Sequence, residues 1–534
     1  MTEDMKKLLT ISVLVALSVS AAAQGVNSTV SVTNDYRSRA ADVNKQTMEM
    51  LVPDSLLHFD YKFDYSVFES PYRGAYEFSP YSIKVSPEAA ALSQRKLFLR
   101  AGAGYTLHPV LDFVWAPVSK GKCAVSVYNT GRGFLGNYTG NASSCFGEGT
   151  FSGWDASDRF GVESRWTLSK AEVKAAASYD FIGAGDGPEM LESMTHAVHA
   201  NAGIASVGSV PVAYRVNIDG EYLSGSDYPA TTPIPFNEYS AGLDGSAGMG
   251  RGAGRIKLDF AARYYSFSAA ETAIALPHFS LTPHYDFVYG ILNVSAGVRL
   301  DYTDRFSIAP DVRISLGAVN DDITVYAGAS GGQYITDFYT LKQGFHRALA
   351  SCTTPGPTHE SLHIYAGLDG HFGSPFRYAF KFGWVNYERT ALETCYGYAS
   401  AMFARIYGNL NLSYVNERIE ADVNLGACSM LIDEERVGAT DYVRDPSLNG
   451  SASFTYNWSK RIYATLFAEG RTAREGVAGT LPGWVDLGVR AELKPSAKWG
   501  LWAEAGNLLG MTMWRNFPCA ESGRRFTAGI TLTL

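Results

Sequence analysis

Long runs of strictly alternating residues constrain this sequence more than any other feature. The stretch RIKLDFAARYYSF, residues 255–267, shows the pattern clearly. Its first face carries Ile256, Leu258, Phe260, Ala262 and Tyr264, and its second face carries Arg255, Lys257, Asp259 and Arg263. The pattern recurs at 212–223, 292–302, 361–372, 418–427 and 485–493. A period of two indicates strands with two different faces. Runs of about 9–12 residues match a tilted strand that crosses a bilayer, whereas strands in globular domains have a mode of about 5–6 residues.

The end of the chain follows the same rule. The sequence GRRFTAGITLTL, residues 523–534, alternates up to its last residue. In lipid every backbone donor and acceptor needs a partner within the protein, so a sheet of such strands has to close on itself. We therefore expect the final strand to pair with the first one, near KLFLRAGAGYT at residues 96–106.

The loop lengths provide an independent test of this interpretation. We identify about 22 strand candidates, which start near residues 97, 110, 122, 158, 171, 193, 212, 237, 254, 276, 292, 306, 322, 360, 376, 401, 417, 450, 461, 484, 499 and 524. Connections after even-numbered candidates are short, whereas those after odd-numbered candidates are mostly long, with 107–109 and 303–304 as short exceptions. Trp115, Trp458 and Trp499 lie near the short connections, where an aromatic girdle belongs.

These patterns predict an all-β fold. We expect residues 96–534 to form a closed antiparallel transmembrane β-barrel of about 22 strands in the bacterial outer membrane. Short turns would lie in the periplasm and long loops outside the cell.

The first residues predict export. Residues 1–23 combine a short basic segment, an apolar run of 13 residues and a small-residue cleavage site, which is typical of a signal peptide. Residues 24–95 form a separate N-terminal segment, which is rich in Tyr, Phe and Pro over 52–85. We expect this segment to act as a reduced plug in the lumen or to dock on a periplasmic partner, with a poorly ordered leader as the remaining alternative.

Composition and motifs exclude several other classes. The net charge of −8 gives no basic footprint for nucleic acid. No Ser/His/Asp or paired-carboxylate arrangement stands out, and no cysteine spacing is typical of a metal site. We therefore expect no enzymatic activity, no cofactor and no metal centre.

Residues 499–534 resemble the end of a TonB-dependent receptor barrel. The matching positions are Asn507, Leu508 and Leu509 at the start of the last outer loop, and Gly523 and Arg524 at the closing strand. The resemblance implies a barrel of about 22 strands that takes part in transport of a solute or nutrient. Such receptors also carry a plug of well over 100 residues, and residues 24–94 are too few for it. The use of TonB or another energising partner is therefore left open.

Charged residues on the second face of the strands are the best functional candidates. They are Arg215, Asp219, Glu221, Arg255, Lys257, Asp259, Arg263, Arg299, Asp301, Asp486, Arg490 and Glu492. We expect them to line the lumen. Because both signs are interspersed, the alternative is that they pair across strands and only stabilise the wall.

Five cysteines fall in or next to the predicted outer loops, namely Cys145, Cys352, Cys395, Cys428 and Cys519. An exported chain permits disulfides between such loops, although spacing does not determine the pairing.

Two functions follow from the sequence. The first is transport of a solute across the outer membrane, and the second is a non-transporting scaffold or accessory subunit that binds lipoproteins or assembly factors. The partners expected are outer-membrane lipid and a surface lipoprotein or periplasmic protein.

Overall fold

The structure is a computed structural model. It describes residues 96–118, 122–140, 149–186, 191–208, 210–229, 232–270, 272–317, 322–394, 396–432, 442–476, 479–516 and 519–534. All of them belong to the compact unit Glu49–Leu534. The predicted signal peptide and N-terminal segment lie outside the described residues.

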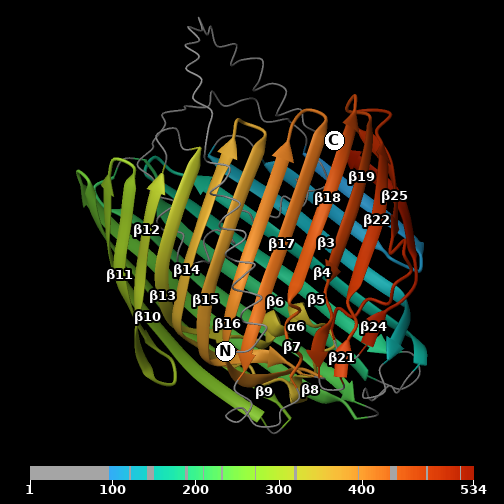
Figure 1. Ribbon diagram of the computed structural model, residues 1–534, viewed down its shortest axis with the longest axis horizontal. Coiled ribbons are helices and arrows are strands. Elements are labelled where there is room, and N and C mark those ends of the chain that lie inside the picture. Colours follow the sequence, from blue (N-terminus) through green and yellow to red (C-terminus); the bar gives the residue numbers. More distant parts are fainter. Residues whose placement is uncertain are drawn as a thin grey trace, which may run out of the picture. The chain divides into compact units, whose positions relative to one another are not determined.

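The described residues form one large antiparallel barrel (Figure 1). Its wall consists of 22 strands: β1 (Leu97–Tyr105), β2 (Val110–Val118), β3 (Cys123–Gly140), β4 (Gly149–Thr167), β5 (Ala171–Asp186), β6 (Leu191–Ser206), β7 (Ala213–Pro229), β8 (Ile234–Arg251), β9 (Gly254–Ala269), β10 (Thr272–Tyr289), β11 (Leu292–Tyr302), β12 (Phe306–Gly317), β13 (Ile323–Thr336), β14 (Gly356–Phe372), β15 (Phe376–Glu393), β16 (Tyr398–Val415), β17 (Ile419–Ile432), β18 (Leu448–Trp458), β19 (Ile462–Arg471), β22 (Trp484–Leu493), β23 (Trp499–Gly506) and β25 (Arg525–Thr533). Each strand pairs with the next one along the wall.

Short elements lie in the connections. They are the strands β20 (Arg474–Gly476), β21 (Gly479–Leu481) and β24 (Cys519–Glu521), the helix α6 (Phe338–Gly344) and the 3₁₀ turn η1 (Ala350–Cys352). Within the described ranges, no helix has the length and apolar character needed to span a bilayer.

The barrel closes through its two terminal strands. β1 pairs with β25 in an antiparallel register that runs from Phe98 opposite Thr533 to Tyr105 opposite Phe526. This pairing leaves neither edge of the wall open. The predicted closure is confirmed, as are the strand number and the antiparallel topology.

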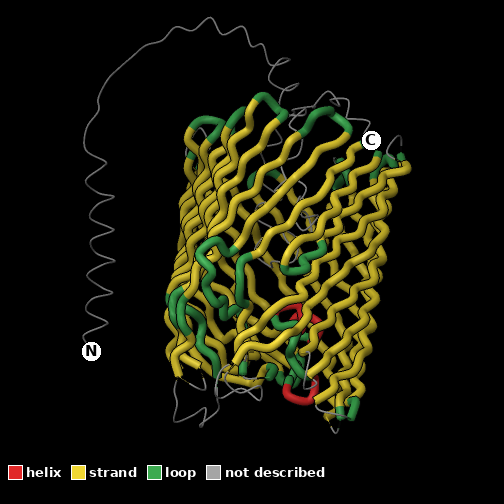
Figure 2. The backbone as a smooth tube through the Cα atoms, turned by 90° about the vertical axis from the view of Figure 1, so that its right-hand side faces the viewer, coloured by secondary structure: helices red, strands yellow, loops and turns green. Residues whose placement is uncertain are grey.

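The two faces of the wall differ as the alternation predicts. On β9, Ile256 is 62% exposed and Leu258 is 39% exposed, whereas Lys257 between them is 9% exposed. Large apolar side chains remain exposed around the whole wall because the outer face of a membrane barrel contacts lipid instead of a protein core. Figure 2 shows the wall from the side, with loops at both rims.

Most predicted strand starts agree with the structure to within about four residues, and β4 is the exception. β4 begins at Gly149, whereas its alternation becomes regular only near residue 158. The reason is length: β4 has 19 residues, more than the roughly 9–11 needed to cross a bilayer. Beyond the membrane the strand contacts no lipid, so its sequence there does not need an apolar face.

The last outer connection contributes a clasp to the wall. β1 and β2 are joined by a short turn, so the outer end of β3 extends past its neighbour. β24 fills this place, because Cys519, Ala520 and Glu521 pair with Gly140, Thr139 and Tyr138 of β3. We call residues 519–521 the seam clasp, since they bridge the wall above the closing strands.

Candidate functional site: a segment folded into the barrel

The connection between β13 and β14 folds inward. Residues 337–353, which we call the inner segment, contain α6 and η1, and they contact the wall strands β4 to β9 (Figures 1 and 2). Asp337 caps the helix, because its side chain accepts a hydrogen bond from the Thr340 amide at 2.7 Å. Burial raises the pKa of Asp337, and the nearby Glu221 adds to this shift.

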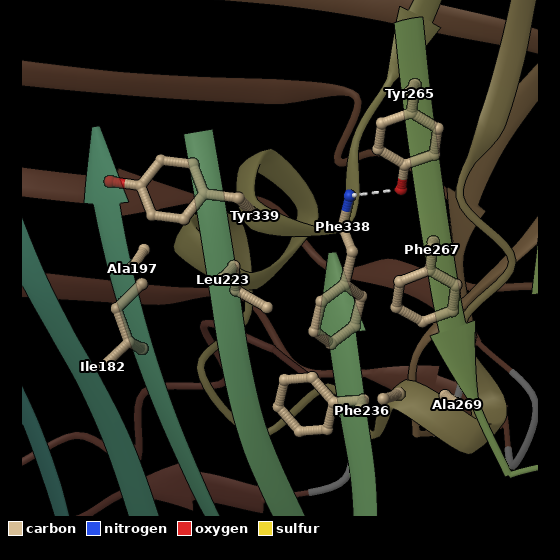
Figure 3. Close-up of a cluster of buried hydrophobic side chains, with 10 residues drawn as sticks. Ile182, Ala197, Leu223, Phe236, Tyr265, Phe267, Ala269, Phe338 and Tyr339 are labelled. Atoms are coloured by element: carbon tan, nitrogen blue, oxygen red, sulfur yellow. Dashed lines mark hydrogen bonds between the residues drawn. The ribbon is translucent and has the colours of Figure 1, made fainter. Parts of the chain in front are cut away.

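Apolar packing anchors the start of the inner segment. Phe338 is fully buried, and its ring lies 5.2 Å from that of Phe236 and 5.1 Å from that of Phe267. Figure 3 shows that Phe338 points into this cluster from α6, while Leu223 and Tyr265 approach from the wall. Complete burial of an aromatic side chain contributes about 1.5–3 kcal/mol, which favours the docked position of the segment.

Glu238 on β8 receives the first backbone amides of α6. Its carboxylate accepts hydrogen bonds from the Phe338 amide at 2.7 Å and the Tyr339 amide at 3.1 Å. The Tyr265 hydroxyl donates to the same carboxylate at 2.5 Å. A helix leaves its first amides without intrahelical partners. The wall therefore supplies the acceptors that this short helix lacks.

Lys342 anchors the other side of the segment. Its Nζ donates to Ser193 Oγ at 2.5 Å and to the Ala348 carbonyl at 2.6 Å, and it lies 4.0 Å from Asp227 Oδ1. Asp227 also accepts a hydrogen bond from the Ala350 amide. Burial lowers the pKa of Lys342 to about 8, and the Asp227 carboxylate opposes this shift.

Tyr339 forms a third anchor. Its hydroxyl donates to Asp180 on β5, and Arg159 on β4 donates to both groups, with 2.8 Å to Asp180 Oδ1 and 2.6 Å to the Tyr339 oxygen. Burial raises the pKa of Tyr339 far above its ordinary value, so the hydroxyl keeps its proton and remains a donor. His346 adds a contact to Asp155 at 2.7 Å.

A second connection folds inward beside the first. In the segment between β23 and β25, Asn516 donates to the Gly344 carbonyl at 3.3 Å. Arg515 forms an ion pair with Glu469 at 2.8 Å and lies 4.7 Å above the ring of Trp484. The two inward segments therefore contact each other.

The structure brings most of the predicted lumen charges into ion pairs. Pairs within the predicted set are Arg263–Asp219 at 2.8 Å, Lys257–Asp259 at 2.9 Å and Arg299–Asp301 at 2.9 Å. Pairs with other residues are Glu221–His199 at 3.0 Å, Arg490–Glu504 at 2.5 Å, Glu492–Lys494 at 3.3 Å and Asp486–Arg525. Arg215 and Arg255 are half-buried on the same face. A role of these twelve residues in solute selection stays a prediction.

The cysteines were candidates for loop disulfides. Cys352 and Cys428 carry free thiols in the structure, and Cys519 is buried against Phe134 and Tyr138. Cys145 and Cys395 lie outside the described residues, so disulfide pairing of the outer loops stays a prediction. In the part of the chain that the structure describes, no three His, Cys, Asp or Glu side chains gather into a potential metal site.

The anchoring residues were not among the sequence candidates. Glu238, Asp227 and Lys342 lie in strand ends and loops, where alternation no longer distinguishes one face from the other. One signal was available, because Phe338-Tyr339 places two large aromatic side chains inside a predicted outer loop. Such a pair indicates that the loop packs against something.

Comparisons with known proteins define the class of fold. The copper transporter OprC aligns with a TM-score of 0.60 and 12% identity, over 82% of this chain and 80% of that protein. The FrpB iron transporter from Neisseria meningitidis aligns at 0.63 and 10% identity, over 82% and 81%. The ferric enterobactin receptor PfeA from Pseudomonas aeruginosa aligns at 0.60 and 10%, over 82% and 80%. No protein-family model and no curated protein matches the sequence.

At these identities the comparisons show the fold. The chain has the 22-strand barrel of TonB-dependent receptors, as the resemblance in residues 499–534 implied. A closed barrel with an apolar outer face is an outer-membrane structure, which confirms the predicted location.

Proposed function

We propose that this protein takes part in the passage of a solute across the outer membrane, with the inner segment as the constriction of its lumen. The observation that carries the proposal is the docking of residues 337–353 on the inner wall through Glu238, Asp227 and Asp180. A segment without functional constraint would expose its polar backbone to water at the rim, as most loops do. This segment instead has matched acceptors on three strands of the wall.

The names of the structural neighbours also support a function in solute passage. OprC is a copper transporter, FrpB is an iron transporter and PfeA is a receptor for ferric enterobactin. The barrel of this chain has the same strand arrangement, so passage through the lumen is the function that the architecture supports best.

The non-transporting scaffold remains the second candidate. It is favoured by the ion pairs of the lumen, which lie along one strand for Lys257–Asp259 and Arg299–Asp301 and between strands for Arg263–Asp219. Charges that neutralise one another in this way contribute little to solute selection. In this case the inner segment would seal the barrel permanently.

Single-channel conductance in a planar bilayer separates the candidates. The full-length protein, a variant without residues 24–95, and a variant in which Gly-Ser linkers replace residues 338–349 are compared. Steady conductance of the full-length protein supports passage. A silent full-length protein that conducts without residues 24–95 supports passage with that segment as a plug. Conductance that rises only when residues 338–349 are replaced assigns the constriction to the inner segment. Silence of all three proteins contradicts the proposal and favours the scaffold.

A further inference from the structure

The short-turn rim of the barrel has a strongly asymmetric charge. Six consecutive positions around this rim, from the β16–β17 turn through the closing strands to the β4–β5 turn, carry exposed cations, and one exposed carboxylate, Glu417, lies beside them. The cations are Arg418, Lys460, Arg461, Lys498, Lys96, Lys122 and Lys170. We call these seven residues the basic arc.

The other half of the rim lacks this feature. The turns at residues 207–212, 290–291 and 373–375 contain neither Lys, Arg, Asp nor Glu. The β8–β9 turn follows a single arginine, Arg251, and β13 follows Asp322. The cations therefore follow one side of the rim instead of being distributed evenly around it.

Tryptophans accompany the basic arc along the outer face of the wall. Trp458 directly precedes the β18–β19 turn and is 66% exposed, and Trp499 directly follows Lys498 and is 47% exposed. Trp115 and Trp166 lie close to the next two turns and are 44% and 39% exposed. Exposed tryptophans of membrane proteins lie at the level of the lipid headgroups. The cations of the arc are thus placed at or just beyond that level.

We propose that the basic arc binds the phosphate groups of anionic phospholipids in the periplasmic leaflet. An even strand number places both termini and the short turns on the periplasmic side. Long basic side chains next to an aromatic band reach lipid phosphates while their stems stay against the apolar surface. Each basic residue near an anionic membrane surface strengthens such binding. The arc would hold anionic lipid along one half of the barrel only.

The geometry favours lipid over an acidic protein partner. The cations are spread one or two to a turn along the perimeter, and their neighbours are outward-facing tryptophans. A docking patch for a folded protein is typically compact, with a central apolar or aromatic anchor. The inference is independent of solute passage, because it concerns the rim and not the lumen.

Quenching of tryptophan fluorescence by brominated lipid tests the proposal. The full-length protein is reconstituted with brominated phosphatidylglycerol or brominated phosphatidylcholine, and the ratio of quenching gives the preference for the anionic lipid. The first variant is R418Q/R461Q/K498Q, which removes three cations of the arc. The matched pair of single variants is Arg461→Gln and Arg377→Gln. Arg377 is also exposed, but it follows an uncharged turn. Heat-modified migration in gels confirms that each variant is folded.

We expect the wild-type protein to prefer phosphatidylglycerol about five-fold. The preference should fall below about two-fold in the triple variant and in high salt, because screening weakens contacts between exposed charges. Arg461→Gln should lower it, and Arg377→Gln should leave it unchanged. Equal quenching by both lipids in the wild-type protein, or an unchanged preference in the triple variant, would overturn the proposal. Binding of soluble polyglutamate that depends on the arc, without any lipid preference, would assign it to an acidic protein and equally overturn the lipid assignment.

Discussion

Lys342 and Asp227 face each other in the interior of the barrel, 4.0 Å apart, and neither side chain is accessible to solvent. One belongs to the inner segment and the other to β7 of the wall. A buried charge without its partner is strongly destabilising, whereas removal of both charges is often tolerated. This asymmetry makes the pair a direct probe of how the inner segment is held.

We expect Asp227→Asn to weaken docking of the inner segment by about 3–5 kcal/mol, because the charge of Lys342 then stays buried without its partner. The double variant Lys342→Met/Asp227→Asn should recover much of this loss, because it leaves no unpaired charge. Hydrogen exchange of residues 338–350 measures the effect, with the amides of β15 as an internal reference. A double variant that docks no better than Asp227→Asn would show that the two charges do not interact.

The same lysine should make docking depend on pH. Burial lowers its pKa from the ordinary 10.5 to about 8, and the charges of Asp155 and Arg347 also act on it. A released segment keeps the lysine protonated up to about pH 10.5, so between pH 8 and 10.5 the released state binds more protons than the docked state. Docking should therefore become more favourable as the pH rises through this window, by at most about 3 kcal/mol.

Below pH 8 both states are protonated, and Lys342 contributes no pH dependence. Protection factors of the inner segment between pH 7 and 10 test this prediction. Lys342→Met serves as the control, and its slope over the window should be flat. A slope of the opposite sign in the wild-type protein would mean that another group controls docking.

Glu238 should control the first turn of α6. Glu238→Ala leaves the amides of Phe338 and Tyr339 without their acceptors, at a cost of about 1–3 kcal/mol for each unsatisfied group. Glu238→Gln retains one acceptor oxygen and should have a smaller effect. We expect these two amides to exchange fastest in Glu238→Ala, more slowly in Glu238→Gln and most slowly in the wild-type protein. An unchanged rate in Glu238→Ala would show that water replaces the carboxylate without loss.

Closure of the barrel should depend on Gly102. A Cβ atom at this position would lie 2.4 Å from the ring of Trp502, which packs across the closing strands. Gly102→Ala forces the ring to move, and we expect a loss of about 1–3 kcal/mol in barrel stability. Gly408→Ala on β16 is the matched control, because a Cβ atom there meets nothing within 4 Å. The measurement is the temperature at which each variant loses its compact migration in gels. Equal temperatures for the two variants would contradict this prediction.

The strands of the barrel could be predicted from the sequence, whereas the contacts of the inner segment could not. In lipid, each strand must show a two-residue period, so β9 could be identified from residues 255–267 alone. Residues 303–304, which we predicted to be a short connection among the otherwise long outer loops, form a tight turn between β11 and β12. The partners of the inner segment could not be predicted, because the Phe338 amide finds its acceptor on Glu238, which is 100 positions away. No local period encodes such a contact.

The same limit applies to the lumen charges. Alternation placed Arg263 and Asp219 on the same face of the wall, but their pairing between β9 and β7 depends on register and twist. The seam clasp is a further case. Residues 519–521 do not alternate over a useful length, and their role arises from the gap that a short β1–β2 turn leaves beside β3.

The seam clasp also sets an order of events during biogenesis. Ser522 donates a hydrogen bond to the Asn137 carbonyl, 385 positions earlier in the chain. β24 can reach β3 only when the C-terminal strands lie beside the N-terminal ones, so the clasp forms together with or after the meeting of β25 and β1. A crosslink between positions 137 and 522 would therefore form only in a fully assembled barrel. Partly inserted barrels would not give this crosslink.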